Sequence, residues 1–120
     1  MEMDLHIEVI KNQDYAMLLV AGEVDAYTSG YFRETMLGVI ENGLNTLIID
    51  MCNVEYIDSS GLGALVGGLR RISENNGSIY IISCSDQVRK VFEITGLERV
   101  FKIFNNSEDA IKAIAEGEAV

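Results

Sequence analysis

The apolar positions along the chain change their period several times, and each period predicts a different element. Residues 5–10 alternate between apolar and polar side chains, as expected for a half-buried strand. Residues 15–21 are almost continuously apolar and predict a second strand that ends at Gly22. The polar segment 12–14 between them is short enough for an antiparallel hairpin.

A helical period replaces the strand pattern from residue 32 onward, and Gly43 is expected to end this helix. Residues 44–50 are apolar at nearly every position from Leu47 and predict a strand covered on both faces, with Asp50 at its end. A second helix is predicted to follow residue 58. Its apolar stripe consists of Leu62, Leu65, Val66, Leu69 and Ile72.

The second half of the chain repeats this rhythm. It predicts a strand at 78–83, a short helix ended by Gly96 and a last strand at 100–104. Asn106 or Ser107 then caps a closing helix. The sequence therefore predicts an α/β fold: a mixed sheet with an antiparallel first hairpin and strand–helix crossovers, packed with about four helices.

Composition narrows the class of protein. With 120 residues, 48% of them apolar, the chain is expected to form one domain over residues 1–120 rather than a disordered segment. A net charge of -10 disfavours both nucleic acid and anionic membrane surfaces as partners. No signal peptide or membrane-spanning run is recognised, so a cytoplasmic location is expected. Cys52 and Cys84 are expected to be reduced thiols, acting as small buried groups at strand ends.

The residues that catalysis would need are not arranged for it. Ile57 and Asp58 stand where a nucleophile elbow at Ser59 or Ser60 would need glycine. The one histidine, His6, is expected to face solvent on the first strand, which leaves no basis for a catalytic triad. There is no metal-ligand pattern or complete nucleotide-binding fingerprint either, so we expect no enzymatic activity, no metal and no cofactor.

The helix after residue 58 contains glycines that lower its intrinsic stability. Gly63, Gly67 and Gly68 each cost about 1 kcal/mol relative to alanine in a helix interior. On a helical wheel, the face away from the apolar stripe presents Ser60, Gly63, Ala64, Gly67 and Arg71. Small residues there would let another protein approach closely, although tight packing inside the domain would explain Gly63 equally well.

Two short strings give this chain a family resemblance. Asp58-Ser59-Ser60-Gly61-Leu62-Gly63 follows a buried strand, and Gly22-Glu23-Val24-Asp25 follows the second strand. Together they resemble the STAS domain family, and more narrowly the stand-alone anti-sigma-factor antagonists of bacterial partner-switching systems. The resemblance covers nearly the whole chain. Asp86 stands where many members have a proline, a departure that concerns the rigidity of a turn.

The resemblance implies a regulatory role. In such antagonists the serine after the aspartate is phosphorylated by the anti-sigma factor, a serine protein kinase, and a PP2C-type serine phosphatase removes the phosphate. That serine is Ser59 here. The predicted partner-binding residues are Glu23, Asp25, Asp58, Ser60, Gly61, Gly63 and Gly67.

Simpler roles remain open for several of these residues. Asp58 could cap the helix or contact the partner, and Ser60 could be a cap or a spacer on the helix face. Solvation of the loop would account for Glu23 and Asp25 as well as partner contact does. The alternative function is a STAS scaffold or ligand-sensing subunit, in a transport, chemotaxis or stress complex, that serine phosphorylation does not switch.

Overall fold

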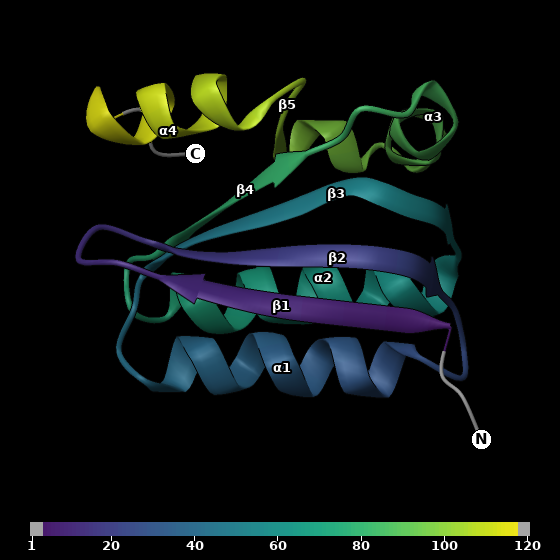
Figure 1. Ribbon diagram of the computed structural model, residues 1–120, viewed down its shortest axis with the longest axis horizontal. Coiled ribbons are helices and arrows are strands. Elements are labelled where there is room, and N and C mark those ends of the chain that lie inside the picture. Colours follow the sequence, from purple (N-terminus) through teal and green to yellow (C-terminus); the bar gives the residue numbers. More distant parts are fainter. Residues whose placement is uncertain (1–3, 118–120) are drawn as a thin grey trace.

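The computed structural model describes residues 4–117, which form a five-stranded mixed sheet with helices on both faces (Figure 1). The strands are β1 (Leu5–Lys11), β2 (Ala16–Val24), β3 (Thr46–Ile57), β4 (Ser78–Ile82) and β5 (Lys102–Phe104). The helices are α1 (Ser29–Glu41), α2 (Ser59–Ser73), α3 (Asp86–Thr95) and α4 (Ser107–Ala115), with a 3-10 turn at Leu97–Arg99. This order of elements confirms the predicted α/β fold.

The strands lie in the sheet in their order along the chain, from β1 to β5. β1 pairs antiparallel with β2, as the short polar turn predicted, and the other neighbouring strands are parallel. The turn is organised by Asn12, whose side-chain oxygen accepts hydrogen bonds from the backbone N–H groups of Asp14 and Tyr15. Parallel neighbours need crossover connections, and α1, α2 and α3 supply them.

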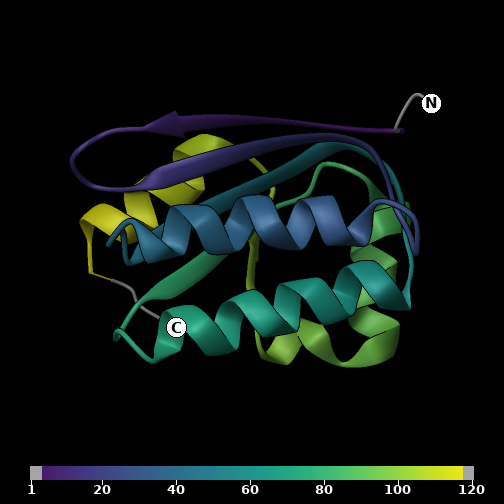
Figure 2. The same cartoon turned by 90° about the horizontal axis from the view of Figure 1, so that it is seen from below.

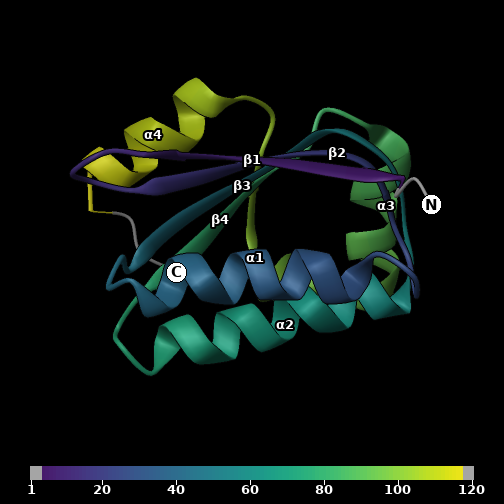
Figure 3. The same ribbon diagram turned by 60° about the horizontal axis from the view of Figure 1, so that its bottom comes forward.

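Each face of the sheet has its own core. α1 and α2 lie side by side beneath one face, and α4 covers part of the other (Figure 3). The larger core joins α1, α2 and α3 to the sheet through Phe32, Met36, Leu65 and Phe92, among others. The smaller core lies under α4 and includes Tyr80, Ala110 and Ala113. The predicted two-sided burial of β3 is confirmed, because Leu47, Ile48 and Ile49 divide between the two cores.

Several strand boundaries differ from the prediction. β2 passes through Gly22 to Val24, because Gly22 adopts a φ of 117° at an irregularity in the β2–β3 register. β3 continues beyond Asp50 to Ile57, where Met51, Val54 and Ile57 are buried between exposed residues. β5 begins at Lys102 rather than residue 100, because the 3-10 turn occupies the segment before it.

The predicted ends of the helices agree with the structure more closely than the predicted strand boundaries do. Gly43 donates its backbone N–H to Ile40 just after α1, and Gly96 ends α3 in the left-handed conformation. Asn106, one of the two predicted candidates, caps α4 by accepting a hydrogen bond from the Asp109 N–H. Local sequence signals therefore located these ends correctly.

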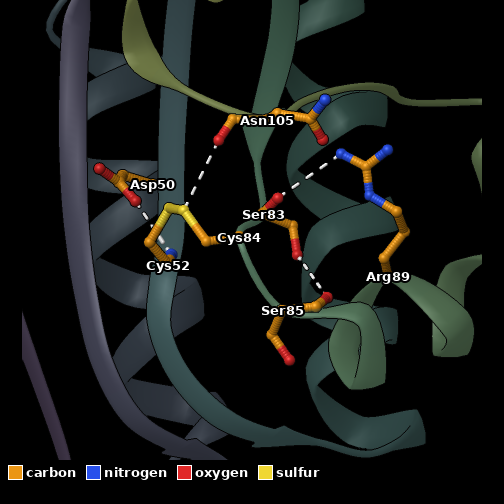
Figure 4. The surroundings of a disulfide bond; sticks show 7 residues. All are labelled: Asp50, Cys52, Ser83, Cys84, Ser85, Arg89 and Asn105. Carbon is orange, nitrogen blue, oxygen red and sulfur yellow. Dashed lines mark hydrogen bonds between the residues drawn. A yellow bond between two sulfur atoms is a disulfide. The ribbon is translucent and has the colours of Figure 1, made fainter.

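The prediction of two reduced cysteines is wrong. Cys52 and Cys84 form a disulfide bond between residues 32 positions apart in sequence, with a Cα–Cα distance of 4.7 Å (Figure 4). Cys52 lies within β3 and is half-buried, and Cys84 is exposed in the β4–α3 connection. The two are neighbours because β3 and β4 are adjacent parallel strands, a fact that spacing along the sequence does not reveal.

Candidate functional site

The two segments that carry the family resemblance meet at one edge of the sheet. β2 and β3 are parallel, and their last paired residues are Val24 and Ile57. The backbone N–H of Asp58 donates to the Val24 carbonyl at 3.1 Å and so joins the two strand ends. α1 and α2 start from this edge and run side by side under the sheet (Figure 2). The β2–α1 loop and the start of α2 therefore form one surface.

Asp58 caps α2. Its backbone is extended, and its side chain accepts hydrogen bonds from the N–H groups of Ser60 at 2.9 Å and Gly61 at 3.3 Å. These are two of the N–H groups in the first turn that have no partner within the helix. The predicted capping role of Asp58 is therefore confirmed, and neither serine is needed as the cap.

Ser59 is the first residue of α2, and its side chain is exposed. Within residues 4–117 the Ser59 hydroxyl makes no hydrogen bond. Ser60 is half-buried, and its backbone N–H is held by Asp58. The two neighbouring serines thus differ: Ser59 presents a free hydroxyl at the surface, and Ser60 is more enclosed.

The β2–α1 loop is held by its own hydrogen bonds. The Asp25 carboxylate accepts from the N–H groups of Tyr27 at 2.9 Å and Thr28 at 3.1 Å. Thr28 is 3% exposed, and its hydroxyl donates to the Glu23 carbonyl at 2.7 Å and accepts from the Asp25 N–H at 2.9 Å. Asp25 therefore shapes the loop, and the Glu23 side chain is left half-buried beside it.

The glycines of α2 divide into two pairs. A Cβ atom on Gly61 would lie 2.6 Å from Val24 Cγ1 and 2.7 Å from Ile57 Cγ1, and one on Gly68 would collide with the Met36 sulfur. Gly61 and Gly68 thus permit close packing against the strands and α1. A Cβ on Gly63 or Gly67 would meet nothing within 4 Å. Gly63 and Gly67 therefore do not serve packing inside the domain.

One residue was assigned to the wrong side of the helix. Ala64, predicted on the outer face with the small residues, is 5% exposed and belongs to the larger core. The interface of α2 with α1 and the sheet is wider than the apolar stripe indicated, since it also includes Gly61 and Gly68. The open surface of α2 is correspondingly narrower.

That open surface borders a shallow groove of about 350 Å³ between α1 and α2. Gly63 and Gly67 form part of its wall. The other residues that line it are Arg33, Leu37, Arg70, Arg71 and Glu74. Arg71 and Glu74 form an exposed ion pair at 2.8 Å. In a chain of net charge -10, a groove with three arginines is a local region of positive charge.

Sequence reasoning missed two residues of this edge. Tyr27 is 93% exposed in the β2–α1 loop, and Tyr56 is 46% exposed near the end of β3. Glu23, which was predicted as a loop residue, lies near the end of β2 and pairs with Tyr56 in the sheet register. A tyrosine among small and polar residues at 25–30 was the available signal for Tyr27. Exposed tyrosines combine apolar area with a hydrogen-bonding group and are favoured in interfaces.

Other kinds of site find little support in the described part of the chain. His6 is exposed on β1, as predicted, and residues 4–117 contain no group of three His, Cys, Asp or Glu side chains placed to hold a metal ion. Among the same residues, no helix has the length and apolar character that crossing a membrane requires. The surface around Ser59 is therefore the candidate site.

Comparison with known proteins agrees with the fold and the motif. Residues 6–110 match the model of the STAS domain, and the chain belongs to this family. The anti-sigma-B factor antagonist of Staphylococcus epidermidis is 33% identical over 106 residues, which cover 88% of this chain and 98% of that protein.

Solved structures show the same fold. An anti-sigma factor antagonist from Mycobacterium paratuberculosis superposes with a TM-score of 0.85 at 22% identity, covering 92% of this chain and 94% of that one. The anti-sigma factor antagonist SpoIIAA in its unphosphorylated form gives a TM-score of 0.80 at 23% identity, covering 92% and 97%.

Proposed function

We propose that this protein is an anti-sigma-factor antagonist switched by phosphorylation of Ser59. In the unphosphorylated form it binds an anti-sigma factor that is a serine protein kinase and so frees the sigma factor. Phosphorylation by that kinase releases it, and a PP2C-type serine phosphatase restores the binding form. The protein acts in the bacterial cytoplasm as a binding partner and as a substrate, and the base and ATP belong to the kinase.

The observation that carries this proposal is the free hydroxyl of Ser59. A kinase needs a reachable serine whose oxygen is not engaged in the fold. Because Asp58 caps α2, the Ser59 hydroxyl is exposed and unbonded within residues 4–117. Ser60, one residue later, is less exposed. The 33% identity to an anti-sigma-B factor antagonist supports the proposed function as an anti-sigma-factor antagonist.

The cap also gives a physical basis for the switch. A phosphate on Ser59 adds close to two negative charges. The N–H groups of Ser60 and Gly61 already donate to Asp58, so they are not free to bind the phosphate unless the cap opens. The added charge lies beside the Asp58 carboxylate and faces outward. Burying it unpaired in an interface costs several kcal/mol, and about 3 kcal/mol is enough to weaken binding roughly a hundredfold.

The surrounding surface fits a protein partner. Tyr27 offers an exposed aromatic anchor, and the open backbone at Gly63 and Gly67 allows a partner helix or loop to approach α2 closely. We assign partner contact to Glu23, Asp25, Asp58 and Ser60 as well. Gly61 contributes to the partner-binding surface indirectly, because it lets the first turn of α2 pack closely onto β2 and β3.

The test is phosphorylation in vitro. The protein is incubated with a candidate anti-sigma serine kinase and ATP, and phosphate is located by mass spectrometry in the native sequence and in the Ser59→Ala and Ser60→Ala variants. We expect modification of Ser59 in the native sequence and in Ser60→Ala, and none in Ser59→Ala. Modification that persists in Ser59→Ala rejects the site.

Binding then distinguishes the two functions. Titration calorimetry against the kinase, with nucleotide present, is expected to give Ser59→Ala an affinity near that of the native protein and phosphorylated protein an affinity about a hundredfold weaker. Equal affinity of the phosphorylated and unmodified forms would exclude the switch, and the STAS scaffold or ligand-sensing function would take its place.

A further inference from the structure

The disulfide lies where the hydrogen bonding between β3 and β4 stops. The paired residues of these strands run from Thr46 with Ser78 to Asp50 with Ile82. Cys52 lies two residues after Asp50, and Cys84 lies two residues after Ile82. Because side chains on one face of a strand recur every second residue, the two cysteines continue the β3–β4 register on the same face as this last pair. Their Cα–Cα distance of 4.7 Å matches the spacing of adjacent strands.

Hydrogen bonds between polar groups also hold the two chain segments next to the disulfide. The Asp50 carboxylate accepts the Cys52 N–H at 3.0 Å, at the point where β4 ends (Figure 4). Just after β4, the Ser83 carbonyl accepts a hydrogen bond from Arg89 of α3 at 3.5 Å, and the Ser83 hydroxyl donates to the Ser85 carbonyl at 3.3 Å. The strand ends are thus positioned by bonds that do not depend on sulfur.

We propose that Cys52 and Cys84 are a reversible redox modification site, oxidised by hydrogen peroxide and reduced by a small thiol such as glutathione. Cys84 is the thiol that reacts with peroxide, and Cys52 is the resolving thiol. Closure ties the β4–α3 connection to β3, and opening releases it while the rest of the fold stays intact.

The two cysteines differ in exposure, as a reaction that begins at Cys84 and ends at Cys52 requires. Cys84 is exposed, so both peroxide and a small thiol reach it. Cys52 is half-buried and packs against the smaller core, so peroxide and small thiols reach it less readily. Exposure is therefore the deciding difference between the two thiols.

One molecule of hydrogen peroxide oxidises the two thiols to the disulfide. The Cys84 thiolate attacks a peroxide oxygen, an S–O bond forms as the O–O bond breaks, and water leaves after protonation. The Cys52 sulfur then attacks the Cys84 sulfenic sulfur, the S–S bond forms, and the S–O oxygen leaves as a second water. Two thiols have lost two electrons and two protons, and the peroxide has gained them.

Reduction uses two small thiols. The first attacks the exposed Cys84 sulfur and frees Cys52, and the second displaces Cys84 to give a small-molecule disulfide. We expect the reduced form to keep its fold, because the β3–β4 pairing from Thr46 to Asp50 and both cores are made mainly by backbone bonds and apolar side chains outside the disulfide. The Cys84 sulfur lies 3.6 Å from the Asn105 carbonyl oxygen, so the free thiol has an acceptor within reach.

The order of reaction is tested with single variants that trap the sulfenic acid. Reduced Cys52→Ser and Cys84→Ser proteins are treated with peroxide and dimedone, and the adducts are quantified by mass spectrometry. We expect Cys84 in Cys52→Ser to be labelled at least about tenfold faster than Cys52 in Cys84→Ser. Faster labelling of Cys52, or no Cys52–Cys84 linked peptide in peroxide-treated native sequence, would overturn the proposal.

Reversibility in the folded protein needs a second measurement. Oxidised protein is treated with reduced glutathione without denaturant, and thiols are counted while circular dichroism monitors the fold. We expect both thiols to be recovered while the circular dichroism spectrum remains that of the folded protein. A bond that glutathione reduces only after the protein has unfolded would show a static structural link instead.

Discussion

Replacing Gly67 by alanine should stabilise the protein, because this glycine lies inside α2 with open space around it. A Cβ atom there meets nothing within 4 Å, so the substitution adds no steric cost. Alanine is favoured over glycine in a helix interior by about 1 kcal/mol. With an unfolding entropy of about 2.1 cal/mol/K per residue, that gain raises the melting temperature of a chain of 120 residues by about 4 °C.

Gly68→Ala is the matched control, one position further along the same helix. Its Cβ would collide with the sulfur of Met36, which is fully buried, and Met36 Cε would lie at 3.0 Å. Overpacking of this kind costs about 1–3 kcal/mol, which cancels or exceeds the gain in helix propensity. We therefore expect Gly68→Ala to melt at or below the temperature of the native sequence.

Differential scanning calorimetry and urea unfolding of the three proteins test this comparison. Gly67→Ala melting below the native sequence, or no difference between the two variants, would refute the reasoning about which side of α2 is open. Gly67→Leu extends the test to function, since a larger side chain at the groove should fold normally yet weaken kinase binding by about tenfold or more. Gly67→Leu that binds as well as the native sequence would remove this face from the proposed interface.

Four further predictions concern the α2 cap, the β2–α1 loop, the switch and the disulfide. Asp58→Ala should lose about 1 kcal/mol of stability in urea unfolding, and Asp58→Asn, which keeps the acceptor oxygen, should lose little; equal losses would contradict the cap. Thr28→Val should cost about 1–3 kcal/mol by leaving the Glu23 carbonyl and Asp25 N–H unpaired, and a Thr28→Ser variant that is equally unstable would speak against the hydroxyl as the cause. Ser59→Asp supplies about one charge where phosphate supplies two, so calorimetry should place its kinase affinity between the unmodified and phosphorylated forms; an affinity equal to either form argues against charge as the cause. Reducing the disulfide removes a constraint on a loop of about 32 residues, worth about 3–4 kcal/mol by chain entropy, and should lower the melting temperature by roughly 10–15 °C; no shift in a reductant titration would contradict this.

The sequence alone determined the elements whose signals are local. Alternation and helical spacing located the strands and helices in the right order, and the positions of Gly43, Gly96 and Asn106 marked ends of helices correctly. The strings at 58–63 and 22–25 together indicated the family. These signals depend only on residues a few positions apart in sequence. Such residues are neighbours in every helix or every strand, whatever the rest of the fold does.

Tertiary structure decided what depends on distant partners. β3 runs on to Ile57 because β2 pairs with it there, although its own sequence after Asp50 mixes polar and apolar residues. Which glycine packs and which stays open was set by neighbours on other elements, such as Met36 opposite Gly68. Cys52 and Cys84 meet only because β3 and β4 are adjacent and in a register that aligns them. Contacts of this kind form when separate elements pack together, so spacing along the chain carries no direct record of them.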